Sequence, residues 1–223
     1  MPAKFSSDPS SGDSHPPEEK YFWLLLYAPN KKGKFGAAIK GNLWLQKDMF
    51  LLTKSIDDLK ELKFDEHILG PFSPVVQSVQ IQHANSGLIK QSLDNNGPIT
   101  LTEKGVLIAK KVWESASAEE KARVSNIKRF MNEMDFHELI AFIYSSFPET
   151  TTNSDVVGEF QKTRLDAAVR LLQRDMVSLE RAATIAGKSL EELMEILKQR
   201  KVKVQDADLE SFKEDLKHLE SLS

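Results

Sequence analysis

The sequence contains no cysteine, which excludes disulfide bonds, thiolate metal sites and cysteine nucleophiles. Its longest apolar run, FWLLLYA at residues 22–28, is about a third of the roughly 20 residues that a membrane-spanning helix needs. The N-terminus lacks the charged start and apolar middle of a secretory signal peptide. We therefore expect a cytoplasmic protein that does not enter a membrane.

An overall excess of positive charge is also missing. The 223 residues carry 30 Lys and Arg against 33 Asp and Glu, and this net charge of −3 argues against a protein that coats nucleic acid by bulk attraction. Residues 21–115 are the exception, with 12 basic and 9 acidic residues. Hydrophobic residues make up 40% of the chain, as expected for a globular protein.

Signals of catalysis are few. The five histidines are scattered, and none has a second histidine four residues away, the spacing that places two imidazoles on one helix face. The segment GKFGAAIKG lacks the Gly-Lys-Ser/Thr ending of a phosphate-binding loop, and there is no Gly-x-Ser-x-Gly elbow. We expect neither an enzyme nor a bound metal or cofactor.

Residues 1–20 form a Ser- and Pro-rich leader with too little apolar surface to fold by itself. The patterns that follow predict helices at about residues 18–28, 43–55, 73–86, 102–113, 118–134 and 136–147, with a lysine-containing loop before the second. Polar Gln46 and Lys47 stand among the apolar residues of that second helix. Ser73, Pro74 and Gly87 are signals for the start and end of the third helix.

Period-two alternation on both sides of DNNG predicts a β-hairpin between the third and fourth helices. The order helix, helix, helix, hairpin, helix is that of a winged helix. We therefore predict a mainly α fold, a winged helix-turn-helix with one small β-hairpin plus a C-terminal helical module. The predicted parts are the leader at 1–20, the winged helix at 21–115, a helical extension at 116–150 and the C-terminal module at 151–223.

In a winged helix the third helix usually enters the major groove of DNA. If Val75, Val76 and Val79 face the core, the neighbouring amides are accessible, and amides can form paired hydrogen bonds with adenine. Lysines outside the helix would have to contact the phosphates. The candidate DNA contacts are Gln77, Ser78, Gln80 and Gln82 on the helix, Lys31, Lys32, Lys34 and Lys40 before the second helix, and Lys90 and Asn95 in the hairpin.

The segment SLERAATIAGKSLEELMEILKQR, residues 178–200, predicts a second helix-turn-helix with Gly187 in the turn. Its second helix carries Glu191, Glu192 and Glu195, which phosphates would repel but which also suit a helix N-terminus. DNA contact, a protein or self-association surface, and a purely structural role all remain open here. The candidate partner or dimer contacts are Leu171, Leu190, Met194 and Leu197.

The segments LQKDMFLL, GPFSPVVQSV, SGLI and ITLTEKG, in that order, resemble the Panacea-type domain of phage-associated and antitoxin proteins, over roughly residues 22–150. Leu69 and Phe72 stand where that family usually has an aromatic residue and a tyrosine. The segment RLDAAVRLLQRDMVSLERAATIAGKSLEELMEILKQRKV is similar to a small prokaryotic and archaeal family of predicted helix-turn-helix antitoxins. Together the resemblances imply regulation or toxin neutralisation.

These patterns lead to two functional hypotheses. The first is a prokaryotic-type, non-enzymatic DNA-binding transcriptional regulator, which could be antitoxin-like and could read two half-sites as a homodimer. The second is a protein-interaction module in which the same helices cover a toxin or a second copy and DNA is incidental. A positive surface beside the third helix would support the first hypothesis, and an apolar groove on the C-terminal helices would support the second.

Overall fold

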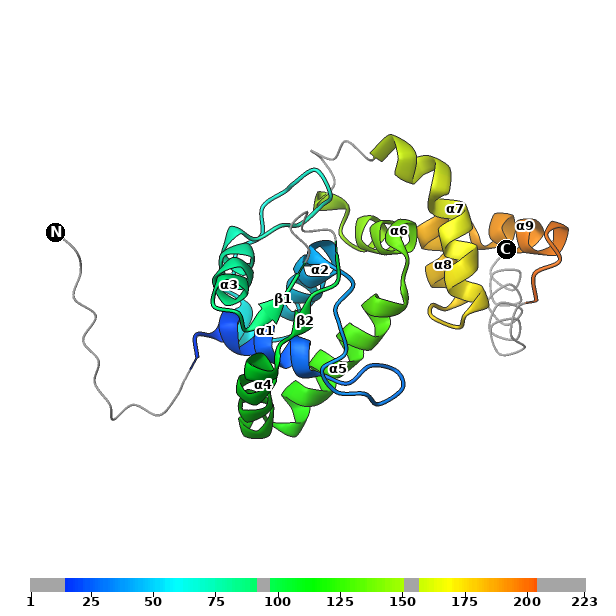
Figure 1. Cartoon of the computed structure of the whole chain (residues 1–223). Helices are drawn as coiled ribbons and strands as arrows, with labels where there is room; N and C mark the ends of the chain where they lie inside the picture. Colours follow the sequence, from blue (N-terminus) through cyan, green and yellow to red (C-terminus); the bar gives the residue numbers. More distant parts are fainter. Residues whose placement is uncertain (1–14, 92–96, 151–156, 204–223) are drawn as a thin grey trace. The chain divides into compact units, whose positions relative to one another are not determined.

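The computed structural model of the chain describes residues 15–91, 97–150 and 157–203 (Figure 1). It is mainly helical with one two-stranded antiparallel hairpin, as predicted from the sequence. The described residues fall into two compact units, one within residues 1–64 and 73–129, the other within residues 65–72 and 130–223. The boundary at residue 129 falls inside a helix, whereas the sequence patterns placed boundaries after residues 115 and 150. Within the described ranges, the helices are too short or too polar to cross a membrane.

The first unit has the element order expected for a winged helix. Its elements are α1 (Pro17–Tyr27), α2 (Asn42–Thr53), the 3-10 turn η1 (Asp57–Leu59), α3 (Pro74–Asn85), β1 (Ile89–Lys90), β2 (Thr100–Leu101), α4 (Glu103–Ser115) and most of α5 (Ala118–Glu133). Helix α1 is the centre of the unit, because it packs against α2, α3, α4 and β2. All six residues from Tyr21 to Leu26 are buried, so every side of this helix is covered.

The predicted helix starts are confirmed, and each has a local cause. Ser73 accepts a hydrogen bond from the backbone N–H of Val76, and Thr102 accepts one from Gly105, which satisfies amides that a helix start leaves unpaired. Gln46 connects α2 to the start of α3, since its side chain donates to Ser73 O at 3.2 Å and accepts from Ser73 N at 2.8 Å. The LQK and FSP segments therefore meet in space, and Gln46 fixes the entry into α3.

The second unit is a set of packed helices. Its elements are α6 (Phe136–Ser146), η2 (Pro148–Thr150), α7 (Val157–Gln173), α8 (Leu179–Ala186) and α9 (Leu190–Gln199). The closest packing joins α7 to α6 and to α8. Gly187 adopts the left-handed conformation, with φ of 66°, between α8 and α9, which confirms the predicted turn. A Cβ at this position would also lie 2.5 Å from the guanidinium carbon of Arg164, so that side chain would have to move.

Candidate functional site

The core-facing side of helix α3 overlaps the predicted one: Val76 is buried and Val79 packs against the core, as predicted, but Val75 does not. Val76, Gln80 and His83 are buried, whereas Val75 is 45% exposed. Gln80 lies four residues after Val76, so both project from the same stripe of the helix and enter the interior together. The prediction that Gln80 is accessible is therefore wrong. Its side-chain amide donates to Gln91, the residue after β1, and so connects α3 to the chain that follows the strand.

The outward face of α3 carries no charge. Ser78 and Gln82 are exposed, as predicted, while Gln77 is partly buried. Val75 and Ile81, at 45% and 46% exposure, lie among them. This face can form hydrogen bonds and apolar contacts, but it offers no cation to a phosphate group.

The hairpin has a third strand position that the sequence analysis assigned to a loop. Ile39 forms an antiparallel bridge with Ile99, beside the pairing of Lys90 with Thr100. Because side chains alternate along a strand, the buried Ile39, Ile89 and Ile99 share the inner face, and Lys40 and Lys90 share the outer face. The two lysines thus belong to one small sheet. Asn95 lies outside the described residues.

The loop before this strand is an ordered turn that presents lysines. Asn30 organises it, because its side-chain Oδ1 accepts hydrogen bonds from the backbone N–H groups of Lys32 and Lys34, each at 3.0 Å. Its backbone N–H also donates to Lys34 O at 3.0 Å, and its carbonyl accepts from Gly33 N at 2.9 Å. Gly33 has a positive φ of 77°, which a lysine would adopt only with strain. Lys31, Lys32 and Lys34 are all exposed.

This turn, residues 30–35, lies away from α3. Its Phe35 ring contacts Tyr27 at the end of α1 and Trp113 near the end of α4, with centroid distances of 5.4 and 5.7 Å. Helix α3 instead packs on the first half of α1, where His83 stacks with Phe22. Figure 1 accordingly shows the turn and α3 at opposite ends of α1. The prediction of a single lysine rim beside α3 is therefore wrong for Lys31, Lys32 and Lys34.

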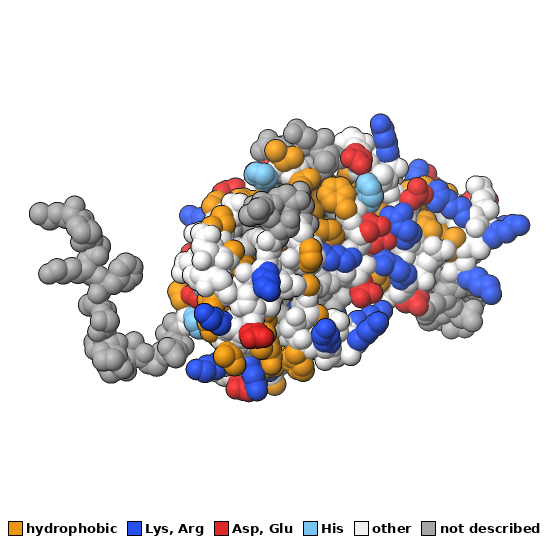
Figure 2. All heavy atoms as spheres, in the orientation of Figure 1, with side chains coloured by type: hydrophobic (Ala, Val, Ile, Leu, Met, Phe, Trp, Pro, Cys, Tyr) orange, Lys and Arg blue, Asp and Glu red, His pale blue; other side chains and the backbone are white. Residues whose placement is uncertain are grey.

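Acidic residues are almost missing from the part of the sequence that forms the turn. From Lys20 to Ile56 the one acidic residue is Asp48, which is fully buried. Figure 2 shows Lys and Arg side chains in the region where Figure 1 draws the turn, among others spread over the same view. We call the exposed residues Lys31, Lys32, Lys34, Lys40 and Lys90 the basic strip. These five lysines were predicted from the sequence, but Asn30 and Phe35 were not. The segment NKKGKF, which contains no acidic residue, was the sequence feature that pointed to them.

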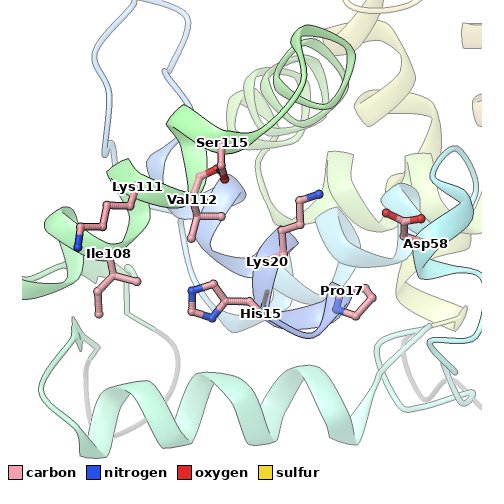
Figure 3. Close-up of a pocket in the computed structure, with 8 residues that line it drawn as sticks. All are labelled: His15, Pro17, Lys20, Asp58, Ile108, Lys111, Val112 and Ser115. Atoms are coloured by element: carbon pink, nitrogen blue, oxygen red, sulfur yellow. Dashed lines mark hydrogen bonds between the residues drawn. The ribbon is translucent and has the colours of Figure 1, made fainter. Parts of the chain in front are cut away.

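A hollow of about 640 Å³ lies in the same unit, at the start of α1 (Figure 3). Ile108, Lys111, Val112 and Ser115 of α4 line it together with His15, Pro17, Lys20 and Asp58. Two of its ionisable groups are already paired: Lys20 with Glu120 at 2.6 Å, and His15 with Glu19 at 3.3 Å. The hollow has the size of a small-ligand pocket.

Glu19 also contacts a buried histidine beside this hollow. His83 Nε2 lies 3.1 Å from the Glu19 carboxylate, and burial lowers the pKa of His83, which favours the neutral ring. The two histidines and one carboxylate do not form a metal site. Across residues 15–91, 97–150 and 157–203, His, Cys, Asp and Glu side chains nowhere assemble in a group of three that could hold a metal ion.

In the second unit, two of the four predicted partner contacts lie in the interior. Leu171 is 0% and Leu197 1% exposed, because both pack inside this helical unit. Their burial corrects the prediction that they form a partner surface. Leu190 and Met194 are partly exposed on α9. The acidic start of α9 has a local cause, since Glu192 and Ser189 form a capping box with hydrogen bonds of 2.9 and 3.1 Å.

Comparison with known proteins concerns the second unit alone. Residues 147–221 match the model of an uncharacterised protein family, UPF0175. A search of curated proteins gave no match. The match includes α8, the turn at Gly187 and α9, whereas the Panacea-type and antitoxin assignments remain predictions. Function must therefore be argued from the surfaces themselves.

Proposed function

We propose that this chain is a non-enzymatic nucleic-acid-binding protein, and that the basic strip contacts the phosphates. The observation that supports the proposal best is the ordered, exposed lysine turn in a stretch whose one acid, Asp48, is buried. Contacts between lysines and phosphates release counterions, so they provide affinity without sequence preference. Because the chain from Lys34 to Lys40 can span at most about 20 Å, these lysines lie close enough to contact one stretch of a nucleic-acid backbone.

The more specific role of a transcriptional regulator has less support than phosphate contact. Base reading by a Gln77 and Gln80 pair has no support, since Gln80 is buried. Support for DNA reading by α3 comes from the element order, from the exposed Ser78 and Gln82, and from Lys40 and Lys90 on the neighbouring sheet. Such reading would rest on few base contacts, each worth about 1–3 kcal/mol.

Removing two lysines of the turn tests the phosphate contact. For Lys32→Ala with Lys34→Ala, we expect weaker binding to all nucleic acids. The slope of log K against log salt should become less negative by about 1.4 for single strands and 1.8 for duplex DNA, since two phosphate contacts are lost. Fluorescence polarisation of labelled oligonucleotides at several salt concentrations measures both quantities.

The matched control is Lys60→Ala with Lys63→Ala, which removes the same charge from the same unit. Lys60 pairs with Asp57 at 2.8 Å, and Asp58 and Glu61 lie beside it in the sequence, so these lysines have acidic surroundings. If the control weakens binding as much as the variant of the turn, or if wild-type binding does not depend on salt, the proposal fails.

The outward face of α3 supports a second function, self-association, because Val75 and Ile81 are half-exposed on a face without charge. If α3 forms a dimer contact, Ile81→Asn should shift the protein from dimer to monomer at tens of micromolar in sedimentation equilibrium. Leu107→Asn is the control, since Leu107 is 65% exposed on α4. A wild-type protein that is monomeric throughout this range contradicts the idea.

A further inference from the structure

We infer that the turn at residues 30–35 selects single-stranded over double-stranded nucleic acid, because Phe35 offers its ring to an unpaired base. This inference rests on the proposed nucleic-acid binding and names the substrate class of the same site. The juxtaposition that carries it is an exposed aromatic ring next to exposed lysines on one ordered turn. Proteins that bind single strands combine these two features, since every unpaired base has a face that can stack.

The ring of Phe35 is exposed, yet its position is fixed. It is 48% exposed, although it contacts Tyr27 at 5.4 Å and Trp113 at 5.7 Å, and these two rings lie 6.0 Å from each other. The next residue also anchors the turn, because Gly36 N donates to Tyr27 O at 2.9 Å. An aromatic ring held in this way needs little further ordering to accept a base, and preorganisation of this kind favours affinity.

The lysines around the ring supply the electrostatic part of the contact. Lys32 and Lys34 are held at their backbones by Asn30, which keeps both on the same turn as Phe35. Glu114, the acidic residue next to Trp113, is paired with Lys110 at 3.7 Å, so its charge is offset locally. A strand whose backbone follows the lysines could place one base on Phe35. A duplex would contact the lysines alone, because its bases are already stacked and paired.

An anionic membrane is the competing polyanion, and the turn suits it less well. Polybasic segments that bind anionic membranes lie beside a membrane-spanning helix or on an amphipathic helix, whereas the lysines of the basic strip lie on a turn and a small sheet. Membrane-binding surfaces also insert several apolar side chains, while here Phe35 rests against Tyr27 and Trp113. The chemistry therefore favours a nucleic-acid strand.

The test compares binding of the full chain to fluorescein-labelled dT15 and to a 15-base-pair duplex at 50 and 200 mM salt. Phe35→Leu keeps apolar contact with Tyr27 and Trp113 but removes the aromatic face. We expect it to weaken dT15 binding about 5- to 100-fold and to change duplex binding less than twofold. Phe35→Tyr keeps the face and should bind dT15 within about threefold of wild type.

The outcomes separate this inference from the function on which it rests. If Phe35→Leu weakens both ligands equally or neither, or if vesicles with anionic lipid displace dT15, the inference is overturned. In the first two cases the lysine contacts still stand. If neither ligand binds in a salt-dependent way, the proposed function itself fails.

Photocrosslinking gives a test that does not depend on a variant folding. A 15-mer that contains 5-iodouracil should crosslink to the wild-type tryptic peptide of residues 35–40, because trypsin cuts after Lys34 and Lys40. A crosslink that maps elsewhere in the chain contradicts stacking on Phe35.

Discussion

Replacing Glu138 by alanine is expected to lower the free energy of unfolding of the second unit by about 2–4 kcal/mol. Glu138 is 2% exposed, and its two carboxylate oxygens accept from Arg170 Nε at 3.0 Å and from an Arg174 nitrogen at 2.5 Å. The same side chain completes the capping box at the start of α6, where it accepts from Asp135 N at 2.9 Å. Alanine leaves two partly covered guanidinium groups without this partner and also removes the cap.

The measurement is urea unfolding followed by circular dichroism. Glu138→Gln should lose less stability, since a glutamine can still act in the capping box. In an Arg174→Met background the effect of Glu138→Ala should shrink, because one of its partners is already absent. Glu195→Ala is the control, as this residue is exposed on α9 and should change stability by no more than about 0.5 kcal/mol. A loss below about 1 kcal/mol for Glu138→Ala would contradict the assigned role of this pair.

Glu138 also bears on the family match. It lies on α6, before the matched residues 147–221, whereas Arg170 and Arg174 belong to α7 and to the turn that follows it. The part of the chain that resembles UPF0175 is therefore joined to α6 by a buried charge contact.

The helix boundaries could be predicted from the sequence because their causes are local. Ser73, Thr102 and Gly187 act on backbone groups within a few residues, so the sequence around each position contains the whole signal. The hairpin is similarly local. Ile39 escaped prediction because its partner, Ile99, lies 60 positions further along the chain.

The burial of individual side chains was harder to predict from the sequence than the helix boundaries. Periodicity separates inside from outside where a helix has one solvated face, but all residues from Leu45 to Phe50 of α2 are buried. Lys47 and Asp48 are among them, although lysine and aspartate side chains are rarely fully buried in proteins. The candidate site shares this difficulty, since the separation of the lysine turn from α3 depends on how both pack on α1.

The second large effect is expected at a lysine in the core of the first unit. Lys128 is 0% exposed, and its ammonium group donates to the carbonyl oxygens of Leu26 at 3.1 Å and Ala28 at 2.9 Å, at the end of α1. Asp48 is also 0% exposed, and its carboxylate oxygens have no hydrogen-bond partner within the described part of the chain. Lys128→Met should therefore cost about 2–5 kcal/mol, because it leaves two buried carbonyls unpaired.

A double variant distinguishes the loss of charge from the loss of packing. At a pH above the raised pKa of Asp48, where its carboxylate is charged, Lys128→Met with Asp48→Asn should recover about 1–3 kcal/mol of the stability that Lys128→Met loses. Arg129→Met, at an exposed neighbour on the same helix, should stay within about 0.5 kcal/mol of wild type. Strict additivity of the two core variants would show that the Lys128 and Asp48 charges do not interact.

The pH dependence of unfolding provides a further readout of the same lysine. Burial lowers the pKa of Lys128 to about 7, with Asp48 opposing the shift, and burial lowers the pKa of Lys47 to about 7 as well. Between pH 7 and about 10.4, the ordinary lysine value, the unfolded chain then binds more protons at these positions than the folded chain. The free energy of unfolding should rise with pH across this window, and the rise should be smaller in Lys128→Met, which retains only Lys47.

The dependence of the free energy of unfolding on pH in the acidic range reports on a different residue. Burial raises the pKa of Asp48, so the folded chain keeps a proton there that the unfolded chain loses, and stability should fall as pH rises above the unfolded value of about 3.9. Asp48→Asn should remove this fall and leave the rise at alkaline pH in place, because Lys128 and Lys47 remain. In the Asp48→Asn background, a stability that stays flat or falls between pH 7 and about 10 would mean that both lysines keep their protons in the folded chain.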